Sequence, residues 1–438
     1  MRPRHVSGML PGIAGSRQSN CFIYRHPGGE EKIDAQTLDL IPKLPIPFAV
    51  LKRKSTAPIA ARGPDPVTSL FSPSCGANKR RAVVTVPVKD EAGYLDVCLA
   101  ALSRQTRAPD EILVLINNSS DHSAAIAKRF AKRSPVPVLV ADVVLAPEQA
   151  HAGGARREAM QWAARRAGEH GILLTTDADG IVAPNWVAVN LASIESGAEA
   201  VAGRAMLDPA DEQRLPLALR EADASECAYA ALLNEIDARL DPNPLDPMPR
   251  HDEHSGASIA VTLAAYRRAG GMPCVSGGED REFFIQLRRV DARIRHASDV
   301  VVTVSGRTEG RAAGGMADTI RRRMIATDAF LDTRLEPARE AIARIGFRRR
   351  LRSLRLEGPV APPAEIHCLA ADLDVPAGLI RRGIGSRYFG AGWMMLEAKS
   401  PRLRRKVVPA AAVTEQIAAA RSYLAKLDGR VLEMEQLA

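Results

Sequence analysis

From Arg81 onward, apolar runs alternate with segments of helical periodicity. The apolar runs predict buried strands at 82–88, 111–116, 136–144 and 171–176, and helical patterns follow them at 94–102, 124–132, 155–167 and 183–194. Strands that alternate with helices at this spacing predict a parallel sheet with helices on both faces. Ligands of such sheets bind at the carboxyl ends of the strands, so we expect functional residues directly after the apolar runs.

The same pattern divides the chain into three parts. Residues 1–78 mix Pro, Gly, Ser and charged residues without sustained periodicity, which predicts a poorly ordered N-terminal extension. Residues 79–312 carry the alternating pattern, and residues 313–438 are mainly helical, which predicts a separate C-terminal helical lobe. Inside the middle part, a helical stretch at 217–240 precedes the Pro-rich segment 241–250, which we expect to be a mobile loop or a lid.

Composition narrows the class of protein. A chain of 438 residues with 46% hydrophobic residues predicts a globular protein of two or three domains. The six cysteines show no CxxC pair and no short even spacing, which favours a reduced, cytoplasmic location over a zinc or disulfide framework. No window offers the roughly 18 apolar residues that a membrane helix requires, and the first residues lack the apolar core of a signal peptide.

The net charge of +9 is compatible with nucleic acid, an anionic membrane surface or phosphorylated ligands. Aromatic residues make up only 4% of the chain and are not interleaved with basic clusters, so we expect no nucleic-acid partner. The basic helical region at 321–355 leaves a peripheral membrane contact or an anionic acceptor open, although a solvated helical face is the simpler explanation.

Two aspartates, Asp177 and Asp179, directly follow the fourth apolar run in the segment TTDADG. Residues two apart on an extended chain project the same way, so both carboxylates can share one target. Two carboxylates aimed together repel each other unless a cation sits beside them. Mg²⁺ and Mn²⁺ take oxygen ligands and typically join one or two carboxylates to a substrate diphosphate. A solvated acidic turn is the alternative, and the position at a strand end favours the metal site.

A second acidic pair, Glu279 and Asp280, follows the segment Ser276-Gly277-Gly278 at the start of a predicted helix. The helix dipole and the free backbone N–H groups favour ionised carboxylates there. One of the two can act as a general base on a hydroxyl group. An ordinary acidic helix start has the same appearance.

Five segments together resemble the signature blocks of family 2 glycosyltransferases with the GT-A fold, in the same order and at the same spacing. They are VPVKDEAGYLDVCLAALSRQT, LVLINNSSD, GGARREAM, TTDADG with the following PNW, and SGGEDREF with the helix after it. The resemblance implies a Rossmann-like, mostly parallel α/β sheet flanked by helices, a nucleotide-sugar donor and a divalent cation, Mn²⁺ or Mg²⁺. It covers about half of the chain and leaves the acceptor unknown.

The resemblance also implies roles for residues of the donor site. Pro87, Lys89 and Glu91 are expected to line the nucleotide pocket, and Asn118 is expected to face the base where the family usually has Asp. Arg156 would approach the diphosphate or the base. Asp177 would contact the ribose or the sugar and Asp179 would hold the metal, with both as candidate ligands.

Five more residues are weaker candidates. Arg307 and Arg311, in SGRTEGR after the last apolar run, suit a bidentate clamp on a diphosphate. His254 and Ser255 stand where the acceptor or the donor sugar would be met, although a solvated loop histidine is the more frequent case. His296 is a candidate for the histidine that often completes the metal site in this fold, but its place in the lead-in to a strand weakens it.

In the mechanism that the resemblance implies, Asp280, with Glu279 beside it, takes a proton from an acceptor hydroxyl, and the anomeric carbon is inverted in one displacement. The first alternative is a sugar-phosphate nucleotidyltransferase, although such enzymes carry a Gly-rich basic loop after the first strand and this chain has KDEAG there. The second alternative is a non-catalytic sugar-nucleotide-binding protein of the same fold, against which the intact carboxylates argue.

Overall fold

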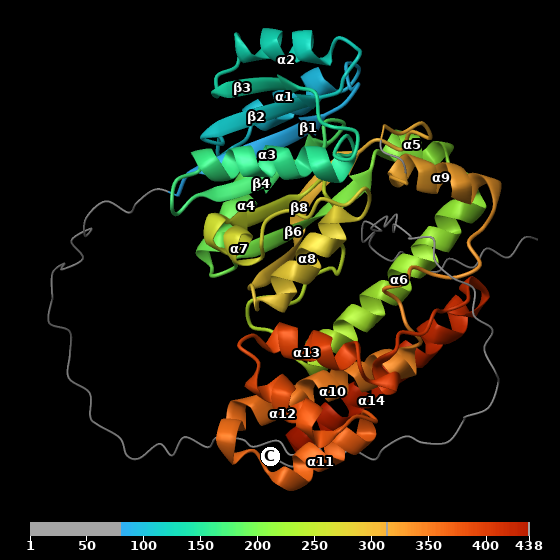
Figure 1. Cartoon of the computed structure of the whole chain (residues 1–438). Coiled ribbons are helices and arrows are strands. Elements are labelled where there is room, and N and C mark those ends of the chain that lie inside the picture. The colour runs from blue at the N-terminus through green and yellow to red at the C-terminus, as the bar shows by residue number, and fades with distance from the viewer. Residues whose placement is uncertain (1–79, 312–313, 437–438) are drawn as a thin grey trace, which may run out of the picture. The chain divides into compact units, whose positions relative to one another are not determined.

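The computed structural model of the chain describes residues 80–311 and 314–436. The predicted extension at 1–78 lies outside these residues. One eight-stranded sheet, in the order β3-β2-β1-β4-β7-β6-β8-β5, forms the centre of the N-terminal part (Figure 1). Its strands are β1 (Ala82–Val88), β2 (Glu111–Asn117), β3 (Val138–Val143), β4 (Ile172–Thr175), β5 (Ile181–Val182), β6 (Ala200–Leu207), β7 (Ile259–Thr262) and β8 (Ile294–Val304).

The predicted mostly parallel sheet is confirmed, although the alternating pattern gave no sign of its two antiparallel strands. β3, β2, β1 and β4 pair in parallel, and β6 pairs in parallel with β8. β7 runs antiparallel to both β4 and β6, and the short β5 runs antiparallel to β8. β7 is only four residues long, three of them buried, and a run of that length carries no signal for strand direction. The sheet is therefore mixed and mostly parallel.

Helices cover both faces of this sheet, as the pattern predicted (Figure 1). Val84 and Val86 of β1 lie in the core under one set of helices, while their neighbour Val83 lies in the core under another. The first set is α1 (Leu95–Ser103), α2 (Ser123–Ala131) and α4 (Trp186–Glu195); the second is α3 (Ala152–Arg166), α7 (Leu263–Arg268) and α8 (Glu279–Arg289). Successive side chains of a strand point to opposite faces of the sheet, and helices bury both faces. The strands are therefore apolar at consecutive positions.

The Pro-rich segment 241–250 is held in place by its own polar groups, which contradicts the expected mobile loop or lid. The carboxylate of Asp246 accepts hydrogen bonds from the backbone N–H of His296 at 2.9 Å and from Arg295 at 3.2 Å. Arg250 donates to Asn234 at 2.8 Å and to Asp237 at 2.7 Å, both on α6 (Leu217–Leu240). Six of its ten residues are Pro or Asp, which are typical of turns whether or not the turn is anchored.

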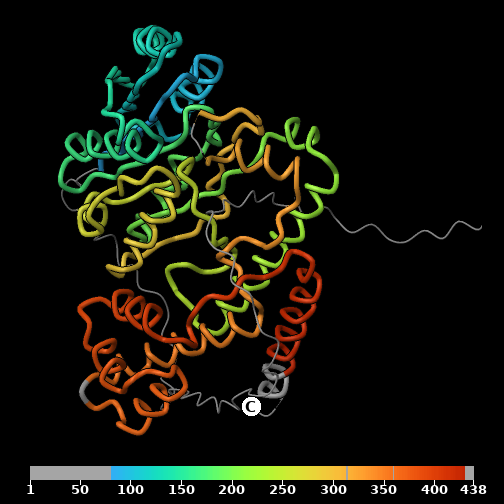
Figure 2. The backbone as a smooth tube through the Cα atoms, turned by 45° about the vertical axis from the view of Figure 1, so that its right-hand side comes forward, coloured from blue at the N-terminus to red at the C-terminus, as the bar shows by residue number. Residues whose placement is uncertain are grey.

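The C-terminal part is helical, as predicted. It contains α10 (Ala338–Glu357), η1 (Gly358–Val360), α11 (Pro363–Asp372), α12 (Ala377–Gly385), α13 (Phe389–Glu397), η2 (Pro401–Leu403), η3 (Ala410–Ala412) and α14 (Val413–Gln436). Helices α10 to α13 share one apolar core, and a second core joins α6 to α10 and α14 (Figure 2). Two shorter helices, α5 (Pro209–Arg214) and α9 (Met316–Ile325), complete the chain. In the part that the structure describes, no helix has the length and apolar character needed to cross a membrane.

Candidate active site

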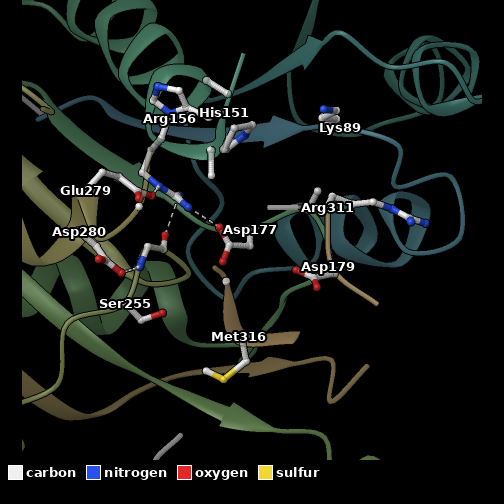
Figure 3. A pocket seen from close by; sticks show the side chains of 18 of the residues that line it. Lys89, His151, Arg156, Asp177, Asp179, Ser255, Glu279, Asp280, Arg311 and Met316 are labelled. Atoms are coloured by element: carbon white, nitrogen blue, oxygen red, sulfur yellow. Dashed lines mark hydrogen bonds and ion pairs between the residues drawn. The ribbon is translucent and has the colours of Figure 1, made fainter. Parts of the chain in front are cut away.

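A cavity of about 290 Å³ lies at the carboxyl ends of β1 and β4, where ligands of such sheets bind. Its wall also includes the start of α8, the loop 253–256 and the segment after β8 (Figure 3). Twelve residues singled out from the sequence line it: Pro87, Lys89, Glu91, Arg156, Asp177, Asp179, His254, Ser255, Glu279, Asp280, Arg307 and Arg311. Segments from residue 87 to residue 311 therefore meet at one cavity.

Asn118 does not line this cavity; its neighbour Asn117 does. The backbone of Asn118 has φ +47°, and its side chain accepts a hydrogen bond from the Leu145 N–H at 3.0 Å and donates to the Leu145 carbonyl at 3.1 Å. Asn tolerates such a positive φ better than most residues. The side chain thus joins the ends of β2 and β3, and the expected contact with a nucleotide base is not supported.

Arg156 is the buried centre of the site, only 4% exposed, which rules out a surface helix charge. Its Nε donates to Glu279 at 3.0 Å, one terminal nitrogen donates to Asp177 at 2.5 Å, and the other donates to Thr175 Oγ1 at 3.0 Å and to the Gly256 carbonyl at 2.8 Å (Figure 3). Burial alone would lower the pKa of Arg156, but Asp177 and Glu279 raise it, so the guanidinium stays charged. One side chain therefore ties α3, the end of β4, the loop 253–256 and α8 together.

Glycines allow this packing at two places. A Cβ on Gly256 would lie 2.4 Å from a terminal nitrogen of Arg156, and a Cβ on Gly153 would lie 2.1 Å from the Val275 carbonyl oxygen. Both distances are too short for any side chain. Gly153 therefore allows close contact between the start of α3 and the loop before α8.

Asp280 faces the cavity from the first turn of α8, after Gly278 with φ +72°. Its Oδ2 accepts the Gly256 N–H at 2.9 Å and its Oδ1 accepts the Arg281 N–H at 2.7 Å. Burial, and next the charge of Glu279, raise the pKa of Asp280 to about 6, while these N–H groups and Arg156 oppose the rise. The carboxylate is oriented, and it takes up a proton close to neutral pH.

At the other end of the cavity, Arg307 lies between two carboxylates. It donates to Glu91 at 2.7 Å and is 3.1 Å from Asp179, and its guanidinium lies 5.2 Å from the ring centre of Tyr94. Burial raises the pKa of Asp179 to about 6, with Asp177 and Glu91 adding to the rise and Arg307 opposing it. Among the described residues, Asp179 shares its ion-pair partner Arg307 with Glu91, which leaves a local deficit of positive charge beside the Asp179 carboxylate.

A divalent cation fits that deficit. Among the residues the structure describes, no three His, Cys, Asp or Glu side chains are grouped to hold a metal by themselves. Sites for Mg²⁺ commonly use one or two carboxylates, with substrate phosphates and waters supplying the remaining oxygens. Asp179 and Asp177 provide such a pair on the cavity wall, and Lys89 lines the same cavity without a hydrogen bond or ion pair to the described residues.

The histidines depart from the sequence expectations. His254 is not a solvated loop residue: it stacks on Phe284 with ring centres 4.3 Å apart and lines the cavity. His296 does not line the cavity, and both of its ring nitrogens are hydrogen-bonded, to Asp246 at 2.8 Å and to His254 at 3.1 Å. His296 is therefore not available as a metal ligand.

Several residues of the cavity wall were not anticipated. His151 caps α3 by accepting the Gly154 N–H at 3.1 Å, and Arg334 from the C-terminal part donates to Asp252 at 2.8 Å. A histidine directly before a helical pattern is a weak capping signal that was available in the sequence. Nothing in the sequence around Arg334 indicates that it returns to a site built by residues 87 to 311.

The comparison with protein families decides between the possible classes of α/β protein. Residues 83–259 match the model of glycosyl transferase family 2. This chain carries a family 2 glycosyltransferase domain. The predicted family and enzyme class are thereby confirmed. The matched range contains the metal-site candidates, and Asp280 of the glycosyltransferase lies 21 residues beyond it.

The solved structures that match this chain include three glycosyltransferases, each with a TM-score below 0.5. TarS 1-349 of S. aureus in complex with UDP-GlcNAc is 17% identical, with 73% of this chain and 91% of that chain covered and a TM-score of 0.39. Mannosyltransferase PcManGT from Pyrobaculum calidifontis, in complex with GDP-Man and Mn²⁺, is 19% identical over 73% and 86%, with a TM-score of 0.38. Glucosyl-3-phosphoglycerate synthase from Mycobacterium tuberculosis is 18% identical over 57% and 77%, with a TM-score of 0.33. No curated protein matches in sequence.

Proposed function

We propose that this glycosyltransferase moves a sugar from a nucleoside diphosphate donor to an acceptor hydroxyl, with a divalent cation at Asp179 and Asp177 and with Asp280 as general base. The observation that carries the proposal is the meeting of these carboxylates at one cavity, although they come from the end of β4 and the start of α8. They stand on either side of Arg156, which bonds to both Asp177 and Glu279. The cavity would thus have a donor end, at Asp177 and Asp179, and an acceptor end, at Asp280.

At the donor end, Lys89 and Arg311 are the cations placed to bind the diphosphate, since Arg307 is held by Glu91. Arg311 donates from Nε to the Asp90 carbonyl at 3.0 Å, which leaves its terminal nitrogens for phosphate oxygens. A bound Mn²⁺ or Mg²⁺ would offset the charge that develops on the leaving diphosphate.

At the acceptor end, Asp280 removes the proton from the acceptor hydroxyl as its oxygen attacks the anomeric carbon. A carboxyl with a pKa of about 6 is ionised at pH 7 to 8 and is a stronger base than an ordinary aspartate. Attack from the side opposite to the diphosphate inverts the anomeric carbon in one displacement. Glu279 keeps Arg156 in place through the 3.0 Å ion pair and is only 6% exposed, so we assign it a positioning role.

The test is Asp280→Asn, assayed by release of UDP from UDP-GlcNAc or of GDP from GDP-mannose with water as the acceptor. We expect donor affinity to be retained and turnover to fall by about 10²- to 10⁴-fold, the usual contribution of a general base. Glu282→Gln, on the same helical turn, is the matched control and should retain turnover. Turnover within about threefold of wild type would remove Asp280 from the reaction. Release of pyrophosphate from a nucleoside triphosphate and a sugar phosphate would contradict glycosyl transfer itself.

A further inference from the structure

A chain of hydrogen bonds runs from a buried carboxylate to the cavity wall. Asp246 Oδ2 is 2.8 Å from His296 Nδ1, and His296 Nε2 is 3.1 Å from His254 Nε2. Asp246 is 5% exposed, and His254 lines the cavity. The three side chains come from the loop 241–250, from β8 and from the loop 253–256, and no step proposed above uses them.

The direction of each hydrogen bond follows from the first one. Burial alone would raise the pKa of Asp246, but the bonds from His296 and the charge of Arg250 lower it, so the carboxylate is ionised and only accepts. His296 therefore carries its proton on Nδ1. Asp246 already has Arg250 at 3.5 Å and Arg295 at 3.2 Å as cationic partners, so an imidazolium at His296 would be a third positive charge on one carboxylate. A ring whose proton lies on Nδ1 presents Nε2 as an acceptor.

The same reasoning shows which ring nitrogen of His254 carries the proton. Because His296 Nε2 accepts, the proton between the two rings belongs to His254 Nε2. Burial, and next the charge of Arg288, hold the pKa of His254 well below its usual range, so its ring is neutral and Nδ1 has no proton. In the described part of the chain this Nδ1 makes no hydrogen bond, and it is not among the atoms buried without a partner. It is therefore a lone pair open to the cavity.

We propose that His254 Nδ1 accepts a hydrogen bond from a hydroxyl of the donor sugar, and that Asp246 sets the direction of this bond through His296. A hydroxyl is the fitting ligand because it donates to the lone pair, which a phosphate or carboxylate oxygen does not. Stacking on Phe284 holds the ring plane, so the lone pair has a fixed direction. The proposal rests on the proposed function, because it assigns part of the same cavity to the donor sugar.

NMR of protein labelled with ¹⁵N-histidine, without any ligand, shows directly which ring nitrogen of His254 carries the proton. We expect His254 in wild type to carry its proton on Nε2, with an unprotonated Nδ1. In Asp246→Asn the amide N–H can donate to His296 Nδ1, so each later bond reverses and His254 should become protonated on Nδ1. A wild-type His254 with its proton on Nδ1, or charged at pH 7.5, would overturn the proposal.

The hydroxyl is tested by calorimetry with UDP, UDP-GlcNAc, GDP and GDP-mannose on His254→Phe, which keeps the stacking on Phe284 and removes both nitrogens. A loss of about tenfold or more for the nucleotide-sugar, with the nucleoside diphosphate unchanged, assigns the hydroxyl to the donor sugar. Unchanged binding of both nucleotide-sugars means that no hydroxyl of the donor sugar reaches His254. His122→Phe, at an exposed histidine outside the cavity, is the control.

Unchanged binding of both nucleotide-sugars would overturn the hydroxyl role, even if the tautomer is as expected. If His254→Phe does not fold, His254→Asn, whose amide oxygen can accept in place of Nδ1, should bind the nucleotide-sugars more tightly than His254→Leu. A wild-type protein that binds none of these donors would contradict the proposed function and the hydroxyl role together, whereas a loss confined to the variants would concern His254 alone.

Discussion

Replacing Arg156 by Gln should both destabilise the protein and shift the pH dependence of its activity. The guanidinium joins Thr175, Asp177, Gly256 and Glu279 in one buried cluster. Gln is neutral and shorter, so it cannot reach all four partners. The two effects have separate causes, because stability depends on the lost cross-link and the pH dependence on the lost charge.

The magnitude of the stability change follows from burial. Arg156 and Glu279 are 4% and 6% exposed, so the substitution leaves Glu279 buried without its cation. Removing one partner of a buried ion pair costs about 3–5 kcal/mol. The side chain of Asp177 is 36% exposed, so water replaces part of its lost interaction and we expect the lower end of the range, about 3 kcal/mol. Arg156 also lowers the pKa of Asp280, so its removal should move the acid limb of activity above pH 6.

Urea unfolding followed by circular dichroism measures the first effect, and the pH profile of donor hydrolysis measures the second. Arg157→Gln is the matched control, because Arg157 is the partly exposed next residue of the same helix, and it should change neither quantity. A free energy of unfolding within about 1 kcal/mol of wild type would refute the cross-link, since that is below the expected cost of a stranded buried charge. An unmoved acid limb would refute the electrostatic link to Asp280.

Three further predictions concern the same cavity. Gly256→Ala places a Cβ 2.4 Å from Arg156 and should reduce both stability and activity, whereas Gly346→Ala, with no neighbouring atom within 4 Å, should be neutral or stabilising by up to about 1 kcal/mol in urea unfolding. In wild type, the rate of donor hydrolysis should be full above pH 7 and fall below about pH 6, because burial raises the pKa of Asp280 and the base must be ionised; a flat profile down to pH 4.5 would contradict this. Arg307→Gln frees Glu91 and Asp179 from their shared cation, so calorimetry should show weaker binding of nucleoside diphosphate without Mn²⁺ and a stronger dependence on it.

The sequence was sufficient for the architecture of the first half of the sheet and for the ends of its strands. Asp177 and Asp179 follow an apolar run, and in a parallel sheet that position fixes the edge on which they lie. Asp280 was found because a Gly-rich segment before an amphipathic helix indicates where the helix begins. In each case the signal is local, lying within a few residues of the side chain concerned.

What the sequence did not reveal depends on contacts between distant residues. Arg156 and Glu279 are 123 positions apart and His254 and His296 are 42 apart, so no periodicity links them. The reversed direction of β7 also has no local signal. Asn118 shows the converse: its residue type and position after β2 were right for a ligand contact, but its two hydrogen bonds to Leu145 use the side chain.

The most direct test of the central claim is whether Asp179 gives nucleotide binding its dependence on a cation. Isothermal titration of UDP and GDP, with and without Mn²⁺, should show at least about tenfold tighter binding with Mn²⁺ in wild type, as expected when the metal bridges carboxylate and diphosphate. Asp142→Asn, at an exposed aspartate outside the cavity, should behave like wild type, and Asp179→Asn should lose the effect of Mn²⁺. Binding that stays equally dependent on Mn²⁺ in Asp179→Asn would contradict the account.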